Sequence, residues 1–543
     1  MLFKPLTRTS LIQTLRATPA RYSRKMSSST VYIGVSAGQP VSSAAAQAVD
    51  KDALAKLWQL SGTKDKAGEA RTFFGVGGDK TVIAISTGTT PDNKGGATKE
   101  NALKELSRRN AGVAVNAVKA INGEQIAIDP LHSPHSAAVG ATLASFAFNL
   151  KTTTAAKKQL EPIQIDLLGS ATESQLETES DKYGKPLTWE TGKIYGEAQN
   201  WARYLKELPA NICTPTRFCE MAEEKFEGLK NVEVQVHDLA WAEEKKMGSF
   251  ISVSRGSDEP LRFLEIHYKG GKADEKPIAL VGKGVTFDTG GISIKPAASM
   301  SDMRADMGGA ATTTATMWAI AKLELPINAV LCCPLTENMP SGKATKPGDC
   351  ITASNGVTLA IENTDAEGRL ILADALYYAS STFKPSVIID VATLTGAMMI
   401  ALGNQFSGVF SNSDSLYAQL DVAAASEKDR VWRMPLDEGY LAQINTTNMD
   451  LNNTGGRLAG SATAAIFLKR FVDGLIVDGT DAEEGAEGGV NGGRGEPGSL
   501  TKWAHIDIAG TMDLAKGDGG YERAGMSGKI TRTLIEFARR YRA

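Results

Sequence analysis

The chain has 543 residues, 42% hydrophobic and 22% charged, the profile of an ordinary globular protein long enough for at least two domains. Lysine and arginine number 59 against 62 acidic residues, and this balance disfavours nucleic acid as the main ligand. Five Cys and five His, without a C-x-x-C pair or an H-E-x-x-H helix, exclude a disulfide scaffold and a His/Cys metal site, so carboxylates would have to hold any metal.

The first 29 residues form a basic segment without an acidic side chain, since the first acid is Asp50. Residues 1–25 mix lysine and arginine with apolar and hydroxyl side chains, which is typical of an organelle transit segment. This pattern predicts a mitochondrial form of the protein. Two alternatives stay open: a disordered basic tail, and a start at Met26 that yields a cytosolic product.

Residues 30–182 are predicted to form an N-terminal α/β domain. Short β-branched runs alternate there with Ala-rich helical stretches, which indicates a mostly parallel sheet. His132 and His135 flank Pro134 and are expected at the surface. A linker over 183–209 follows, with one long helix that Pro209 ends. The predicted elements are strands at Thr81–Ser86 and Gln164–Leu168 and helices at Lys99–Ala120 and Thr188–Leu208.

Residues 210–543 are predicted to form a second α/β domain with more glycine turns. Its most apolar run, Val387–Gly403, is interrupted by Asp390 and Gly396, so it predicts a buried strand and a helix rather than a membrane span. Residues 477–499 are acidic and rich in glycine, which predicts a solvated loop. Further predicted elements are strands at Ile278–Gly282, Ile327–Cys333 and Ser386–Val391 and a helix at Ala310–Leu323.

Two clusters of charged residues carry the candidate chemistry. The first, between 280 and 311, holds Lys283, Asp288, Lys295 and Asp306, and Asp288 precedes a Thr-Gly-Gly turn that permits close backbone approach. The second is N-T-D-A-E-G-R-L at Asn363–Leu370. Its Asp365 and Glu367 would share one face of an extended segment or converge in a turn, and an apolar helix-like run follows.

Each acid alone is most simply a solvated loop charge, and each lysine an ion-pair partner. The acids as a set indicate more, because neighbouring carboxylates repel one another unless a cation joins them. Oxygen ligands suit hard or borderline divalent metals, and a pair of such ions is a known hydrolytic arrangement. The clusters therefore predict a carboxylate-held metal centre.

These motifs closely resemble those of the leucyl aminopeptidases, the two-metal, hexameric cytosol aminopeptidase family. The resemblance covers the C-terminal half, whereas the N-terminal domain is assigned by position only and the 477–499 insert departs from the family pattern. It implies two α/β domains joined by a helix, the second being the catalytic metallopeptidase domain with a mixed sheet flanked by helices. The matching stretches are Leu208–Thr216, Val281–Pro296, Asn363–Leu370, Asp390–Ala397 and Trp503–Gly510.

The resemblance also implies a role for each site residue. One divalent ion would bind Asp288, Asp365 (through its main-chain oxygen as well) and Glu367, and the other Lys283, Asp288, Asp306 and Glu367. Zinc or manganese is expected, and magnesium is the third candidate. Lys295 and Arg369 would be the catalytic pair, with bicarbonate on Arg369 as general base. The residues lining the pocket for the first substrate side chain would be Met303, Thr393 and Gly396.

The charges agree with this scheme, because four carboxylates would balance two divalent ions if Lys283 binds as a neutral amine. Burial and nearby cations lower a lysine pKa readily. Lys295 would stay charged and, with one ion, stabilise the oxyanion that forms when an acidified water attacks the carbonyl. The other ion would take the substrate's α-amine and so confine cleavage to the first residue.

The predicted activity is removal of the N-terminal residue, preferably Leu or another apolar residue, from peptide substrates by a cytoplasmic homo-hexamer without a membrane segment. The alternatives are nucleic-acid binding by the oligomer, which the near-neutral net charge disfavours, and an inactive scaffold, which the complete acid set disfavours. His505 is expected to be a hydrogen-bonded core histidine, and Cys332 and Cys333 small core residues.

Overall fold

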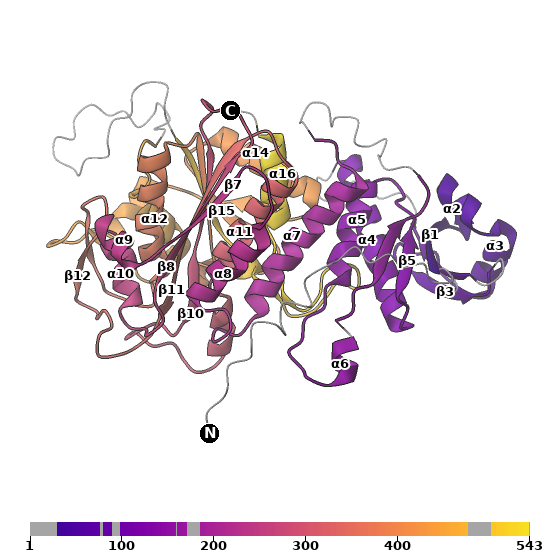
Figure 1. Cartoon of the computed structure of the whole chain (residues 1–543), viewed down its shortest axis with the longest axis horizontal. Helices are drawn as coiled ribbons and strands as arrows, with labels where there is room; N and C mark the ends of the chain where they lie inside the picture. Colours follow the sequence, from indigo (N-terminus) through magenta and orange to yellow (C-terminus); the bar gives the residue numbers. More distant parts are fainter. Residues whose placement is uncertain are drawn as a thin grey trace.

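The computed structural model describes residues 30–76, 80–88, 98–158, 160–170, 185–475 and 501–541. The predicted transit segment 1–29, the expected boundary at 182 and the acidic insert 477–499 lie outside the described residues. Two main sheets lie toward opposite ends of the long axis, and helices cover both (Figure 1). The predicted α/β fold class is confirmed.

The first sheet has the strand order β3-β4-β1-β5-β6, with β2 paired to β1. Strands β4, β1, β5 and β6 are parallel, while β3 and β2 are antiparallel to their neighbours. All residues of β4 are buried, which fits a parallel strand covered on both faces. The bounds are β1 Thr30–Ser36, β2 Gln39–Pro40, α2 Ser43–Ala48, α3 Lys51–Leu60, β3 Ala70–Phe74, β4 Thr81–Ser86, α4 Lys99–Ala120, β5 Gln125–Ile128, α5 Pro134–Ser145, α6 Thr154–Lys158 and β6 Gln164–Leu167.

Helix α7, Trp189–Glu207, lies between the two sheets (Figure 1). It begins with a capping box between Thr188 and Thr191 and ends just before Pro209, so the predicted helix is confirmed within one residue at each end. The helix packs against α5 of the N-terminal part and against α11 and α16 of the C-terminal part. A single hydrophobic core therefore runs from the first sheet across α7 to the second.

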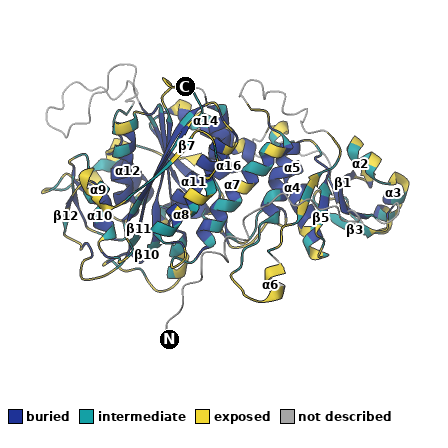
Figure 2. Cartoon of the chain, viewed as in Figure 1, coloured by how far each residue is buried: buried dark blue, intermediate teal, exposed yellow. Residues whose placement is uncertain are grey.

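The second main sheet has nine strands in the order β16-β15-β18-β14-β9-β11-β8-β7, with β10 beside β11. Its centre is parallel, and β7, β8 and β15 introduce antiparallel pairs, so the sheet is mixed as the resemblance implies. Both faces are buried: Leu280 faces the core with α7 and α11, and Ala279 and Val281 face the core with α12 and α15. Figure 2 shows these central strands as buried.

The remaining elements follow the order of the chain. In the first part they are α8 Pro215–Phe226, β7 Val232–His237, α9 Leu239–Glu244, α10 Gly248–Ser254, β8 Arg262–Lys269, β9 Ile278–Gly282, β10 Gly284–Asp288, η3 Met300–Ala305, α11 Gly308–Lys322, β11 Asn328–Asn338, β12 Cys350–Thr352, β13 Thr358–Ala360, α12 Gly368–Phe383 and β14 Val387–Ala392. The later ones are α13 Gly396–Leu402, β15 Ser407–Ser411, α14 Asp414–Glu427, β16 Val431–Arg433, η4 Glu438–Gln443, β17 Leu451–Asn452, α15 Gly460–Lys469, β18 Lys502–Asp507, η5 Ala509–Thr511, β19 Asp513–Leu514, β20 Gly525–Met526 and α16 Thr531–Arg540.

Strand β11 is longer than the sequence predicts. It continues from Cys333 to Asn338 because these added residues pair with β8 on one side and with β10 on the other. The polar side chains of Thr336, Glu337 and Asn338 interrupt the apolar run, so a hydrophobicity pattern does not show this end of the strand. Within the described part of the chain, no helix has the length and apolar character that a membrane crossing needs.

Candidate metal centre

The predicted site residues gather where parallel strands of the second sheet end. Lys283 directly follows β9, Asp288 is the last residue of β10, and Thr393 follows β14. Carboxyl ends of parallel strands share one edge of a sheet, which is where α/β proteins place their ligands. Glu367 comes to this edge from the turn before α12, and Asp306 from the residue after η3.

Lys283 lies at the centre of the buried part of the site, with 3% of its side chain exposed. Its Nζ is 2.7 Å from a carboxylate oxygen of Asp306 and 2.9 Å from Oε1 of Glu367, and it donates a hydrogen bond to the Thr393 carbonyl at 2.9 Å. A Cβ at Gly368 would lie 2.5 Å from Cε of Lys283, so a larger residue there would displace the lysine from this position.

Asp288, Asp365 and Glu367 converge beside this lysine. Each offers a carboxylate oxygen, and these oxygens all lie within 4.8 Å of one another. Lys295, with 21% of its side chain exposed, joins two of them: its Nζ is 2.7 Å from Oδ2 of Asp288 and 2.5 Å from Oδ1 of Asp365. Of the two conformations left open by the sequence, the segment is not extended: Asp365 lies in a turn, and Glu367 immediately precedes α12 with helical backbone angles.

The turn after β10 locks the two sequence motifs together. Gly290 has φ +87°, and a Cβ there would lie 2.5 Å from the Ser293 carbonyl and 2.8 Å from Oδ1 of Asp365, so the position requires glycine. The Thr364 hydroxyl donates to the Gly290 carbonyl at 2.6 Å and accepts from the Ser293 amide at 2.8 Å. The turn that carries Asp365 in one motif thus contacts the Gly290 turn of the other directly.

The site has more negative than positive charge, because four carboxylates surround only two lysine ammonium groups, Lys283 and Lys295. Burial raises the pKa of Asp288, and the Glu367 charge raises it further; burial also raises the pKa of Asp306 and of Asp365. Burial would lower the pKa of Lys283, but Asp306, Glu367 and Asp288 raise it above its ordinary value. The donor set therefore fits divalent cations, whose binding would release the Lys283 proton.

Arg369 projects from the first turn of α12 and is buried, with 8% exposed. Within the described residues, its Nε and Nη1 have no hydrogen-bond partner. Burial lowers its pKa to about 10, although Glu367 and Asp507 oppose that shift. A buried guanidinium with free donors is a receptor for an anion.

The three residues expected to line the pocket for the first substrate side chain occupy different surroundings. Thr393 is buried and its hydroxyl donates to Oδ1 of Asp306 at 2.7 Å. Met303 lies half-buried in η3, and Gly396 is exposed at the start of α13. A Cβ at Gly396 would meet no atom within 4 Å, so this glycine leaves open space.

Two asparagines at the site, Asn338 and Asn453, are not among the residues that the sequence predicts for it. Asn338 donates from Nδ2 to Oδ1 of Asp288 and to the Thr364 carbonyl. Oδ1 of Asn453 accepts from the Glu362 amide, and its Nδ2 donates to the Asn363 carbonyl at 2.6 Å. The only sequence signal for Asn338 is a polar residue at the end of an apolar strand.

The sequence also predicts the surroundings of several His and Cys residues outside the site, and the structure confirms some of these predictions and contradicts one. His505 is fully buried and its Nδ1 is 2.5 Å from Oδ1 of Asp390, and Cys332 and Cys333 are fully buried, as predicted. The expectation for His135 is wrong. It lies in α5, 1% exposed, with Nδ1 2.9 Å from the Thr191 hydroxyl, because α7 covers the helix that begins at Pro134.

Residues 200–535 match the model of the cytosol aminopeptidase family, catalytic domain. The chain belongs to the cytosol aminopeptidase family. It is 43% identical to the cytosol aminopeptidase of Dictyostelium discoideum over 90% of this chain and 88% of that one, and 44% identical to that of Sus scrofa over 90% and 86%. The predicted family and activity are confirmed: the chain is a peptidase, a metal-dependent hydrolase that acts at the N terminus of peptides.

Solved structures of related proteins match nearly the whole of this chain. The bottromycin maturation enzyme BotP in complex with Mn has a TM-score of 0.75 at 27% identity, over 94% of this chain and 99% of that one. A mutant of tomato leucine aminopeptidase has a TM-score of 0.73 at 26% identity, over 95% and 94%. The likeness extends across both sheets, so it includes the N-terminal part that carries little motif signal.

Proposed function

We propose that this aminopeptidase uses two divalent ions per subunit and prefers Leu or another apolar residue at the peptide N terminus. The observation that carries the proposal is the convergence of the Asp288, Asp365 and Glu367 carboxylates within 4.8 Å, beside a buried lysine. We further propose residues 210–543 as the catalytic domain, 30–182 as the N-terminal domain and 183–209 as the linker.

The proposed ligands divide between the two ions. One ion would bind Asp288, Asp365 and Glu367, and the other Lys283, Asp288, Asp306 and Glu367. Zinc or manganese suits this set, with magnesium as the third candidate, and the name of the BotP complex with Mn supports manganese. Bound ions supply Lewis acidity and a water acidified toward neutral pH.

Lys295 is proposed to stabilise the charge that develops on the substrate's carbonyl oxygen. Its ammonium stays charged, because Asp288 and Glu367 raise its pKa although burial opposes them. With a fifth of its side chain exposed, it can reach a substrate, whereas Lys283 cannot. A preorganised cation at this place stabilises a transition state more than a ground state.

Arg369 is proposed to hold a bicarbonate ion, which supplies a general base. Its unpartnered Nε and Nη1 support an anion at this position, since a charged guanidinium donates strong hydrogen bonds to an oxyanion. The positions of Met303, Thr393 and Gly396 would shape the pocket for the first side chain. The open space at Gly396 supports a pocket there.

The assembly and location of the enzyme are proposals from the same family resemblance. We propose a homo-hexamer that acts on peptides in the cytoplasm, with a mitochondrial form directed by residues 1–25. Light scattering tests the hexamer, and a fluorescent reporter fused to residues 1–30 tests the mitochondrial form. A reporter that stays diffuse in the cytosol would remove the transit segment from the proposal.

The Glu367→Gln variant tests the two-ion proposal. It removes one negative charge from a shared ligand, so we expect loss of turnover on leucine amide together with loss of bound metal. Metal content by elemental analysis and hydrolysis with added Zn²⁺ or Mn²⁺ are the measurements. Glu362→Gln changes an exposed acid in the same segment and should behave as the parent enzyme. A Glu367→Gln enzyme with near-normal turnover and two bound ions would refute the proposal.

A further inference from the structure

The side chain of Asn338 contacts both segments that form the candidate metal centre, the end of β10 and the turn before α12. It is the last residue of β11 and stands opposite Asp288, the last residue of β10, in the parallel pair of these strands. Its carbonyl accepts from the Thr289 amide at 3.0 Å and from the Thr289 hydroxyl at 2.8 Å. Only 4% of the residue is exposed, so protein contacts, and not solvent, surround its side chain.

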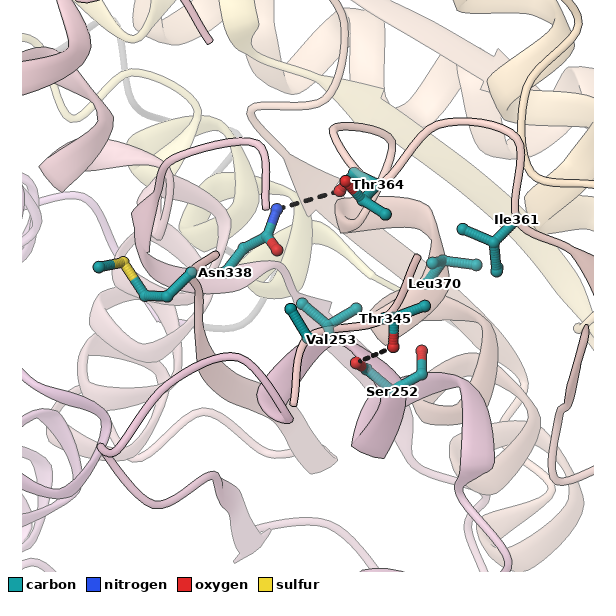
Figure 3. A pocket seen from close by; sticks show the side chains of 9 residues that line it. Ser252, Val253, Asn338, Thr345, Ile361, Thr364 and Leu370 are labelled. Carbon is teal, nitrogen blue, oxygen red and sulfur yellow. Dashed lines mark hydrogen bonds between the residues drawn. The ribbon is translucent and has the colours of Figure 1, made fainter. Parts of the chain in front are cut away.

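The Asn338 side chain uses both N–H groups within the site. Nδ2 donates to Oδ1 of Asp288 at 2.8 Å and to the carbonyl of Thr364 at 3.0 Å. Thr364 immediately precedes Asp365, so the two bonds connect a carboxylate on β10 to the turn that carries Asp365 and Glu367. Figure 3 shows the amide of Asn338 pointing toward Thr364 across the upper end of a small cavity.

The amide is also the chemically suitable group at this position. Oδ2 of Asp288 faces Lys295, and Oδ1 accepts from Asn338 and from the Gly290 amide at 2.9 Å, so the carboxylate is fixed in one orientation. A neutral donor orients the carboxylate without removing its charge. A carboxylate in place of the amide would add repulsion, and an apolar group would leave Oδ1 and the Thr364 carbonyl with fewer donors.

We propose that Asn338 is a positioning residue that presets the Asp288 carboxylate and the Asp365 turn for binding divalent ions. The inference deepens the proposed function and rests on Asp288 being a metal ligand. Outer partners of metal ligands change metal affinity by about 10–100-fold when they are removed. A residue that only braced the fold would instead change the stability of the protein with or without metal.

The test measures Mn²⁺ affinity of the full-length chain by competition with a chelator. Asn338→Leu removes both donors at similar volume, and we expect its affinity to fall by about 10-fold or more. Asn338→Asp keeps the shape of the side chain, so it is the second test variant if the leucine variant fails to fold. Its added negative charge should repel the Asp288 carboxylate and so also weaken Mn²⁺ binding. Excess Mn²⁺ should restore turnover of both variants in part, because it refills the weakened site, whereas added metal would not repair a purely structural defect.

The matched control is Thr345→Val, on another wall of the same cavity. Thr345 is buried and its hydroxyl donates to the Ser252 carbonyl at 2.6 Å, a bond that Figure 3 shows separate from the bond between Asn338 and Thr364. Parental Mn²⁺ affinity in both Asn338 variants, or an equal loss in Thr345→Val, would overturn the inference. Asp288→Asn separates the two proposals: if it too binds Mn²⁺ normally, the proposed function fails as well.

Discussion

Two lysines in one motif have different surroundings, and the difference decides what each can do. Lys283 is enclosed by Asp306, Glu367 and a carbonyl, and its donors point only at protein atoms. Lys295 lies across Asp288 and Asp365 with part of its side chain open to solvent. The first is therefore suited to the metal and the second to the substrate.

Methionine substitutions of these lysines should separate metal binding from turnover. Lys283→Met removes a proposed ligand, so we expect one of two ions to bind more weakly. Lys295→Met should retain both ions and lose about 10²–10³-fold in kcat, the usual effect of removing one oxyanion-stabilising group. Metal titration and steady-state kinetics on leucine amide are the measurements. Lys343→Met, at an exposed position, is the control. Equal metal loss in both site variants would contradict the assignment.

At the scale of elements, α12 has Glu367 and Arg369 at its start, and hydrogen bonds connect its later residues to α10, to the loop after β12 and to β8. Asp374 accepts from the Phe250 amide at 2.9 Å and the Ser354 amide at 2.7 Å. Further along the helix, the Tyr378 hydroxyl donates to Glu265 on β8 at 2.9 Å. The N-terminal end of α12 therefore has a defined position relative to the strands that end at the metal centre.

Glu265 should make the folded protein sensitive to acid. Burial raises its pKa, but the nearby His237 and the hydrogen bonds with His267 and Tyr378 outweigh burial and lower the pKa to about 2. An unfolded glutamate titrates near pH ~4.3. The stability that this carboxylate contributes is thus complete above that pH and is lost as the pH falls toward about 2.

Urea unfolding between pH 5 and 3 checks this expectation. Glu265→Gln should flatten the dependence of the free energy of unfolding on pH, because the titrating group is gone. Glu244→Gln, at an exposed position of α9, should leave the slope unchanged. A parental slope in Glu265→Gln would show that other carboxylates dominate the acid response.

At the scale of the whole molecule, buried charges join the N-terminal and C-terminal parts of the chain. Glu427 at the end of α14 is 2.9 Å from Nη1 of Arg532 in α16 and 3.2 Å from Nη2 of Arg108 in α4. His135 of α5 approaches the same carboxylate, with its Nε2 at 3.7 Å. Burial opposes ionisation of Glu427, but Arg108, His135 and Arg532 lower its pKa below the usual range.

Glu427→Gln should destabilise the protein strongly. It leaves two buried arginines short of a countercharge, and breaking a buried pair costs about 3–5 kcal/mol. The midpoint of urea denaturation at pH 7 measures the loss. Glu105→Gln is the comparison, because Glu105 contacts Arg108 at a more exposed place and should cost less. A change below ~1 kcal/mol in Glu427→Gln would show that solvent or relaxation replaces the lost charge.

The sequence by itself determined the family, the α/β class and the identities of the acids and lysines, because each is encoded in a short local run. The strand at Ile278–Gly282 and the helix at Lys99–Ala120 agree with the structure for the same reason: their apolar periodicity is local. The Thr-Gly-Gly turn after Asp288 could also be anticipated, since positive φ selects glycine.

Only the tertiary structure decided how these residues meet. Asn338 bonds to Asp288 from 50 residues away, Thr393 to Asp306 from 87, and Arg108 to Glu427 from 319. His135 is buried because a distant helix covers it, which its neighbours in sequence cannot show. Burial, desolvation and charge pairing depend on what surrounds a group in space, so the local pattern identifies the candidate ligands but not the contacts that orient them.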